Sequence, residues 1–164
     1  MTAHVQLITN PDAGSYRAAK IEALRHAFSR HGAKVTLTHC GPGRDAQIAE
    51  DADLIVVAGG DGTLRHVAIA ALARRKTIPI ACFPMGTVNL LHLEQGGPAS
   101  PEAFAGCHDE VWVFLVVVER AKACPVGSLL LQRNSPRLDQ GDEIGIGFDS
   151  GDLFFGDAGH GWVV

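Results

Sequence analysis

The sequence predicts an α/β fold with a parallel sheet flanked by helices. Short apolar segments alternate with amphipathic ones at close spacing, which is typical of strand–helix–strand units with right-handed crossovers. One apolar segment, 53–58, has an unbroken core, as expected of a parallel strand covered on both faces. The predicted strands span 5–9, 34–39, 53–58 and 78–83.

Helices are predicted between these strands from their apolar spacing. Residues 16–31 place Ile21, Leu24 and Phe28 on one face, and Gly32 is positioned to end that helix. Residues 63–76 carry a second apolar stripe. Shorter helices are predicted at Asp45–Asp51, 90–94 and 101–107.

The last third of the chain predicts an incomplete β-rich segment. The apolar run Val111–Val118 favours a buried strand, and 129–132 favours another. The glycine-rich, acidic stretch 141–161 is predicted to be loop, and the chain stops at an apolar end. We therefore expect an α/β domain over residues 1–118 and an incomplete or aberrant C-terminal segment over 119–164.

Composition limits the class of protein. Of 164 residues, 46% are apolar and 20% are charged, so the chain is globular, and its net charge of −4 argues against nucleic-acid binding. No apolar run is long enough to cross a bilayer, and no targeting segment is evident. Cysteines without close-paired spacing favour a reducing, cytoplasmic setting; they are Cys40, Cys82, Cys107 and Cys124.

Three glycine-containing loops each follow a predicted strand: NPDAG at 10–14, GGDGT at 59–63 and PMGTVN at 84–89. In a parallel sheet all of them emerge at the carboxyl edge, where open α/β folds bind ligands. The glycines of GGDGT allow backbone N–H groups to approach a phosphate. Asp61 beside a polyphosphate needs a bridging divalent cation, or takes a proton from an attacking hydroxyl. The motif therefore favours phosphoryl transfer.

This order of motifs resembles the catalytic domain shared by diacylglycerol kinases, sphingosine kinases and bacterial lipid kinases. The resemblance covers about residues 4–95, and the Asn10-Pro11 start and the Pro84–Asn89 segment carry it together with GGDGT. It implies a Rossmann-like kinase domain of the NAD kinase and diacylglycerol kinase type over residues 1–118. NAD kinases and 6-phosphofructokinases also resemble the chain at the GGDG turn.

The resemblance implies binding of ATP with Mg²⁺ and transfer of the γ-phosphate to a lipid hydroxyl, such as that of diacylglycerol. Asp61 would be catalytic, either as part of the base machinery or on the metal–phosphate assembly. Positive charge would come from Mg²⁺, helix N-termini, Arg17 or Arg65, because no P-loop lysine pattern is present. The implied nucleotide-binding residues are Asn10, Ala13, Gly14, Gly59, Gly60, Gly62, Thr63, Gly86, Thr87 and Asn89.

The chain also departs from the family pattern. Arg65 and His66 stand where the family has Asn-Glu, and family members are about twice as long; the stretch 145–149 resembles the start of their second domain. An NAD kinase-like enzyme and a non-catalytic nucleotide-binding fragment are therefore the alternatives. His66 and His92 are interpreted as surface or packing residues. Transient membrane contact and a homodimer are further expectations.

Overall fold

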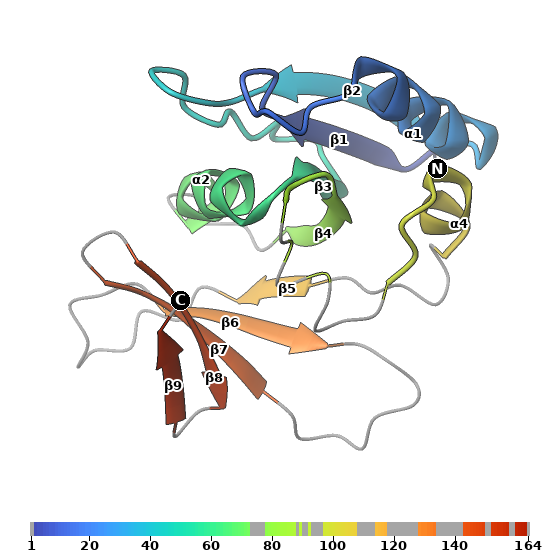
Figure 1. Cartoon of the computed structure of the whole chain (residues 1–164). Coiled ribbons are helices and arrows are strands. Elements are labelled where there is room, and N and C mark those ends of the chain that lie inside the picture. The colour runs from blue at the N-terminus through green and yellow to red at the C-terminus, as the bar shows by residue number, and fades with distance from the viewer. Residues whose placement is uncertain are drawn as a thin grey trace.

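The structure is a computed structural model that describes residues 2–72, 78–87, 89, 92, 97–107, 114–117, 128–133, 143–149, 152–157 and 160–163. For Leu72 and for the strands after 113, only the backbone is described. Figure 1 shows the elements in order: β1 (His4–Thr9), α1 (Ala18–Arg30), β2 (Lys34–His39), β3 (Leu54–Gly59), α2 (Asp61–Leu72), β4 (Pro79–Pro84), α4 (Pro101–Gly106), β5 (Phe114–Val117), β6 (Ser128–Arg133), β7 (Glu143–Asp149), β8 (Asp152–Asp157) and β9 (His160–Val163).

The described strands form one sheet with the order β2-β1-β3-β4-β5-β6-β7-β8-β9. Strands β1 to β4 pair in parallel, with Val5 beside Leu54 and Ile55 beside Ile80. From the β4–β5 pair onward every pairing is antiparallel. The predicted α/β class with a parallel sheet is confirmed. The division of the chain at residue 118 stays a prediction.

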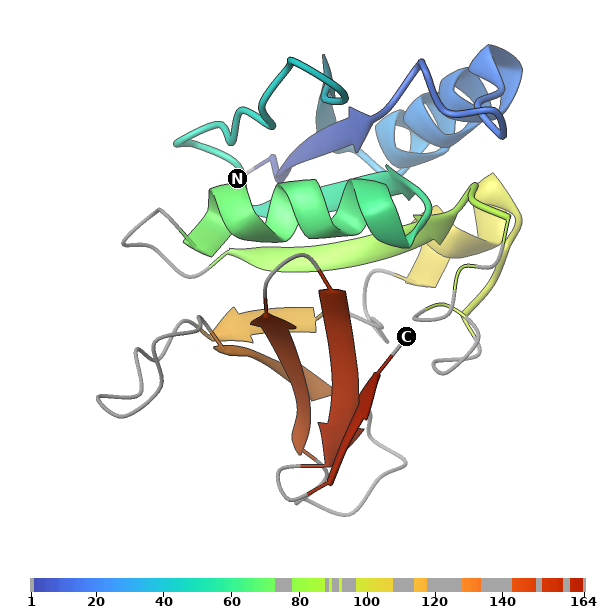
Figure 2. The ribbon, with the colours of Figure 1, turned by 60° about the vertical axis from the view of Figure 1, so that its left-hand side comes forward.

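Helices cover both faces of the parallel strands, as Figure 2 shows, with α2 on one face and α1 and α4 on the other. Alternate residues of β3 divide between the two cores because side chains of a strand point to opposite faces. Val56 and Ala58 pack towards α1, whereas Ile55 and Val57 pack towards α2. The apolar run in β3 therefore serves two cores at once.

The two long helices follow the predicted patterns with shorter bounds. In α1 the buried residues are Ile21, Leu24, Ala27 and Phe28, and the helix is followed by Gly32 at φ 82°, a left-handed conformation that suits glycine. The helix α2 begins at Asp61, two residues before the predicted start. The last three residues of the glycine motif, 61–63, are thus part of the first helical turn, and Gly59 ends β3. Most of the predicted helix at 90–94 lies outside the described residues.

The predicted helix at Asp45–Asp51 is wrong, because this segment is irregular and its backbone groups are bound by Gln6. The side chain of Gln6, fully buried on β1, donates to the carbonyl of Gln47 at 2.7 Å and accepts from the amide of Ala49 at 2.8 Å. It also donates to Thr38 Oγ1 at 3.1 Å. These bonds satisfy backbone groups that a helix would otherwise pair internally.

The prediction of loop across 141–161 is also wrong. Strand β7 pairs antiparallel with β8, and β8 pairs antiparallel with β9. In β7 the apolar residues Ile144, Ile146 and Phe148 keep the strand period, and glycines lie between them. The strands predicted within 111–118 and at 129–132 are confirmed as β5 and β6. None of the described helices is long and apolar enough to span a membrane.

The role of Gln6 predicts a large effect for Gln6→Leu. Leucine fills similar space but leaves the Gln47 carbonyl and the Ala49 amide unpaired, at a cost of about 1–3 kcal/mol for each group. Urea denaturation should show the loss, and hydrogen exchange should show faster exchange at Ala49.

Gln47→Ala is the matched control. The side chain of Gln47 is exposed and only its backbone carbonyl meets Gln6, so the free energy of unfolding should change by less than about 0.5 kcal/mol. Equal effects of the two substitutions would contradict the conclusion that the Gln6 side chain holds the segment 45–51 in place.

Candidate nucleotide-binding site

The strand order brings the predicted loops to one edge of the sheet. The NPDAG loop follows β1, and the GGDGT motif follows its neighbour β3. The chain leaves β1 towards β2 on one side and continues at β3 on the other, so this edge is a topological switch point. The third loop follows β4, next to β3.

The NPDAG loop is held by Asn10, which is half-buried. The Oδ1 atom of Asn10 accepts from the amide of Asp12 at 3.0 Å, and the Asn10 carbonyl accepts from the amide of Ala13 at 3.2 Å. A fourth loop, which follows β2, lies against this one. A Cβ atom on Gly41 would come within 2.8 Å of Asn10 Oδ1. The sequence shows Gly41 only as a chain breaker, because its contact depends on the pairing of β1 with β2.

The remaining residues of that loop are more open. Gly14 is exposed, and a Cβ atom there would meet nothing within 4 Å. Its carbonyl accepts a hydrogen bond from Arg17 at 3.1 Å. Ala13 is half-buried, and its carbonyl accepts from the amide of Tyr16 at 2.9 Å. Arg17 therefore stabilises the turn before α1 by donating hydrogen bonds to the carbonyls of Gly14 and Tyr16.

The GGDGT motif makes a compact entry into α2. A Cβ atom on Gly59 would lie 2.6 Å from Oγ1 of Thr63, so the buried Thr63 side chain covers the Gly59 backbone. The carbonyl of Gly60 accepts from the amide of Leu64 at 3.1 Å and starts the helix. Gly62 is exposed with open space around it. A larger residue at position 59 would disturb this packing.

The loops after β3 and β4 touch backbone to backbone. A Cβ atom on Gly86 would lie 2.5 Å from Cα of Gly60. Asn89 fixes Gly86 from the other side: its Oδ1 accepts from the Gly86 amide and its Nδ2 donates to the Gly86 carbonyl, each at 2.6 Å. Asn89 has φ 54°, a left-handed conformation that asparagine tolerates better than most residues. Thr87, which follows Gly86, is exposed.

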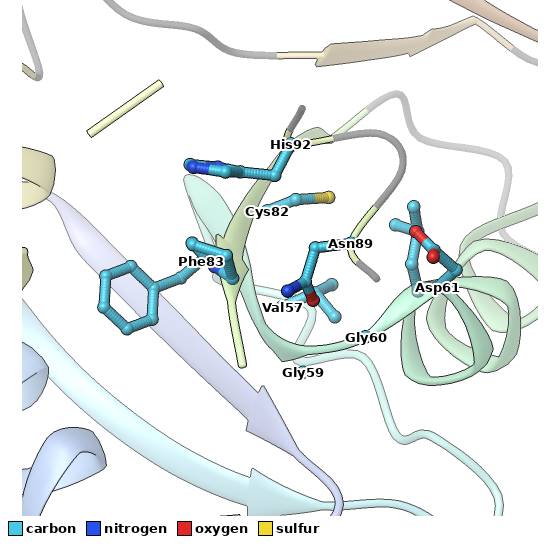
Figure 3. A pocket seen from close by; sticks show the side chains of 10 residues that line it. Val57, Gly59, Gly60, Asp61, Cys82, Phe83, Asn89 and His92 are labelled. Carbon is cyan, nitrogen blue, oxygen red and sulfur yellow. The ribbon is translucent and has the colours of Figure 1, made fainter. Parts of the chain in front are cut away.

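A small pocket opens where these loops meet. Asp61, half-buried in the first turn of α2, lines it together with Asn89 from the loop after β4 (Figure 3). The lining residues come from β3, α2, β4 and the segment after β4; they are Val57, Gly59, Gly60, Asp61, Leu64, Cys82, Phe83, Pro84, Asn89 and His92. The structure thus brings Asp61, Gly59, Gly60 and Asn89 together. The other predicted residues lie outside this pocket lining; they are Asn10, Ala13, Gly14, Gly62, Thr63, Gly86 and Thr87.

Two groups in the pocket are held uncharged by their surroundings. Burial raises the pKa of the Cys82 thiol, and the nearby carboxylate of Asp61 raises it further. Burial lowers the pKa of His92, a hydrogen bond to the backbone of Cys82 opposes that change, and the charge of Lys20 lowers it again. Both groups favour their neutral forms at neutral pH.

Lys20 contributes a positive charge that the sequence pattern did not single out. Its Nζ atom donates to the carbonyl of Pro84 at 3.2 Å and lies 4.8 Å from the centre of the Phe83 ring. Arg65, which the sequence offered as a phosphate contact, has its Nε atom buried without a hydrogen-bond partner. Helical spacing alone could not reveal the Lys20 contact, because Pro84 lies 64 residues away.

Comparison with known proteins decides the family. The profile of the diacylglycerol kinase catalytic domain matches residues 4–110, more than half of the chain. The chain belongs to this family. The match covers the parallel strands, α1, α2 and α4, and therefore all of the loops described above. No curated protein matches the chain.

Solved structures agree on the fold. Two structures of a candidate diacylglycerol kinase from Bacillus anthracis str. Sterne are similar, each at 24% identity, with TM-scores of 0.52 and 0.51. The alignments cover 62% and 61% of this chain but 37% of the Bacillus protein in each case. The chain thus spans well under half the length of these neighbours. At this identity the likeness supports the fold alone.

The contact between Gly60 and Gly86 predicts that Gly86→Ala destabilises the chain. The added methyl group overlaps both Gly60 and Asn89, so we expect a loss of about 1–3 kcal/mol in the free energy of unfolding. Gly62→Ala in the same region should instead stabilise by about 0.5–1 kcal/mol, because residue 62 is helical and uncrowded. Urea denaturation of both variants checks the pair, and a loss at Gly62 matching that at Gly86 would contradict it.

Proposed function

We propose that this chain is the nucleotide-binding part of an ATP-dependent lipid kinase that transfers the γ-phosphate of ATP to a lipid hydroxyl. The contact of Gly60 with Gly86 carries the proposal. It leaves two glycine backbones free of side chains beside a carboxylate, at the carboxyl edge of a parallel sheet. Family membership supports phosphoryl transfer over simple anion binding.

The phosphates would lie at the first turn of α2. The amides of that turn and the positive end of the helix favour an anion there. On this proposal Gly59, Gly60 and Gly62 allow the close approach, while Thr63 holds the turn against Gly59. Gly86 and Asn89 supply the facing wall, with Thr87 beside them. Asn10, Ala13 and Gly14 would meet the part of the nucleotide that extends over β1.

Asp61 fits a shared role with Mg²⁺. Among the described residues no group of three or more metal-ligating side chains occurs, so this part of the chain offers no closed metal cage. Magnesium bound with nucleotides commonly takes one or two carboxylates and completes its shell with phosphate oxygens and water. Asp61, half-buried beside the glycines, suits that arrangement. When bound, Mg²⁺ would offset charge on the phosphate oxygens.

The acceptor is proposed to be a lipid hydroxyl, such as that of diacylglycerol. Such an acceptor resides in a membrane, so the enzyme would act in the cytoplasm with transient contact to the membrane surface. A homodimer stays a prediction. Binding of nucleotide without transfer is the second candidate function, favoured by the pocket itself: among its described lining residues Asp61 is the one acid.

Calorimetric titration of Mg-ATP into the chain tests the nucleotide site. We expect saturable binding that Asp61→Asn weakens about tenfold when Mg²⁺ is present, a change of about 1.4 kcal/mol. Without Mg²⁺ the variant should bind ATP at least as well as the wild type, because a repulsive charge is gone. Asp45→Asn, at an exposed position between β2 and β3, is the control and should leave binding unchanged. Absence of binding by the folded wild-type chain would refute the site.

Transfer of labelled γ-phosphate separates the functions. Labelled product with diacylglycerol in mixed micelles supports the lipid kinase. Labelled NADP with no response to micelles would assign an NAD kinase-like activity instead. Binding with neither product would identify a non-catalytic nucleotide-binding module. If Asp61→Asn abolishes transfer while Mg-ATP binding is kept, Asp61 belongs to the base machinery and not to the metal assembly.

A further inference from the structure

Side chains from elsewhere in the chain bind backbone groups in the carboxyl half of β4. Among the described residues, β5 pairs only with Pro79 and Ile80. Further along this strand, two side chains form hydrogen bonds with backbone groups. His92 hydrogen-bonds the backbone of Cys82, and Nζ of Lys20 donates to the carbonyl of Pro84. Two side chains that can carry positive charge therefore bind backbone groups two residues apart on the strand.

This place is also the wall of the pocket. His92, Cys82, Phe83 and Pro84 all line it, and Figure 3 shows His92 beside Cys82. Lys20 lies over the Phe83 ring and is half-buried, so the apolar ring partly shields its charge from water. An ammonium group keeps two further N–H donors after the bond to Pro84. The pocket thus has an acid at α2 and a basic corner at β4, made of His92 in its lining and of Lys20 against the lining residues Phe83 and Pro84.

The charge state of the basic corner depends on what the pocket contains. Burial lowers the pKa of His92, and the positive charge of Lys20 lowers it as well, although the hydrogen bond to Cys82 opposes them. With no anion present the imidazole is therefore neutral at neutral pH. A phosphate group next to both side chains offsets the charge of Lys20 and favours the imidazolium.

We infer that His92 and Lys20 form a phosphate-binding pair, and that His92 takes up a proton from solvent when a phosphate group enters the pocket. The inference rests on the proposed nucleotide-binding function and adds a residue pair to it. The imidazolium and the ammonium supply positive charge that the glycine loops lack. The ligand class is a phosphate-bearing molecule, either the nucleotide itself or an acceptor with a phosphate headgroup.

The other groups around His92 are not expected to take up a proton when a phosphate group binds. Lys20 on α1 already carries its charge, and the thiol of Cys82 on β4 is kept protonated by burial and by Asp61. Asp61 on α2 lies across the pocket and does not contribute to the shift at His92. Gly97, whose Cβ would lie 3.5 Å from the imidazole, has no ionisable side chain. His92 is therefore the group expected to change protonation.

Calorimetry of Mg-ATP binding in buffers of different ionisation enthalpy measures the proton directly. We expect uptake of a fraction of a proton near pH 7 in the wild type. We also expect affinity about threefold higher at pH 6 than at pH 8, beyond the change that the nucleotide itself causes. His92→Gln should remove the uptake and the extra pH dependence. His26→Gln, at an exposed position on α1, should behave as the wild type. Equal proton uptake in the wild type and His92→Gln would overturn the inference.

A second measurement does not depend on nucleotide. The imidazole signal of His92, assigned by its loss in His92→Gln, is followed by NMR through a pH titration. Lys20→Met keeps the aliphatic packing on Phe83 and removes the charge, so the pKa of His92 should rise. Inorganic phosphate or glycerol 3-phosphate should raise it in the wild type. A purely structural Lys20 would leave the pKa unchanged.

The outcomes separate the two proposals. If Mg-ATP does not bind but inorganic phosphate raises the pKa of His92, the phosphate-binding pair stands and the nucleotide function falls. A response to glycerol 3-phosphate that exceeds the response to Mg-ATP assigns the pair to the acceptor. If Mg-ATP binds and the His92 titration is unmoved by any of these ligands, the pair is overturned while the nucleotide function stands.

Discussion

The backbone of the loop after β3 lies directly against the backbone of the loop after β4, and the geometry of the pocket depends on that contact. Gly60 and Gly86 approach so closely that a Cβ atom on Gly86 would lie 2.5 Å from the Cα of Gly60. Asn89 holds Gly86 in this position through a pair of hydrogen bonds. The contact sets the distance between the start of α2, with Asp61, and the segment that carries His92. Backbone packing, and not side-chain recognition, thus shapes this site.

A second constraint acts on the other half of the sheet. The residue Gln6 is buried on β1 and binds the connector before β3 through its amide group. A buried polar side chain requires partners, and here the partners are backbone groups of a segment that would otherwise need a helix to satisfy them. The connector between β2 and β3 therefore contains no helix, and Gly41 near its start lies against Asn10 of the NPDAG loop. Packing on the face of β1 therefore influences the carboxyl edge.

Much of the fold follows from local patterns. Strands β1 to β4 and helix α1 appear in the apolar spacing, because such spacing reflects the two faces that each element buries. The connector at 45–51 was missed because its conformation depends on Gln6, more than forty positions earlier in the chain. The strands β7 and β8 were missed because the glycines and acidic residues of 141–161 favour a loop locally, whereas pairing with neighbouring strands decides the conformation. At the pocket, Asp61 and Asn89 could be named from the motifs. Lys20 and His92 could not, because both act through backbone groups of β4.

The sequence by itself determined the alternation of strands and helices, the placement of three glycine loops after strands, and the family. These are properties of short segments, since hydrophobic period and glycine position are local signals. Only the tertiary structure decided which loops touch and which charges meet. The strand order places β3 between β1 and β4, which brings Gly60 to Gly86. It also lets Lys20 on α1 reach Pro84, 64 residues away, because α1 packs on the same face of the sheet as Phe83. Such pairings depend on how the layers stack, and no spacing within a segment encodes them.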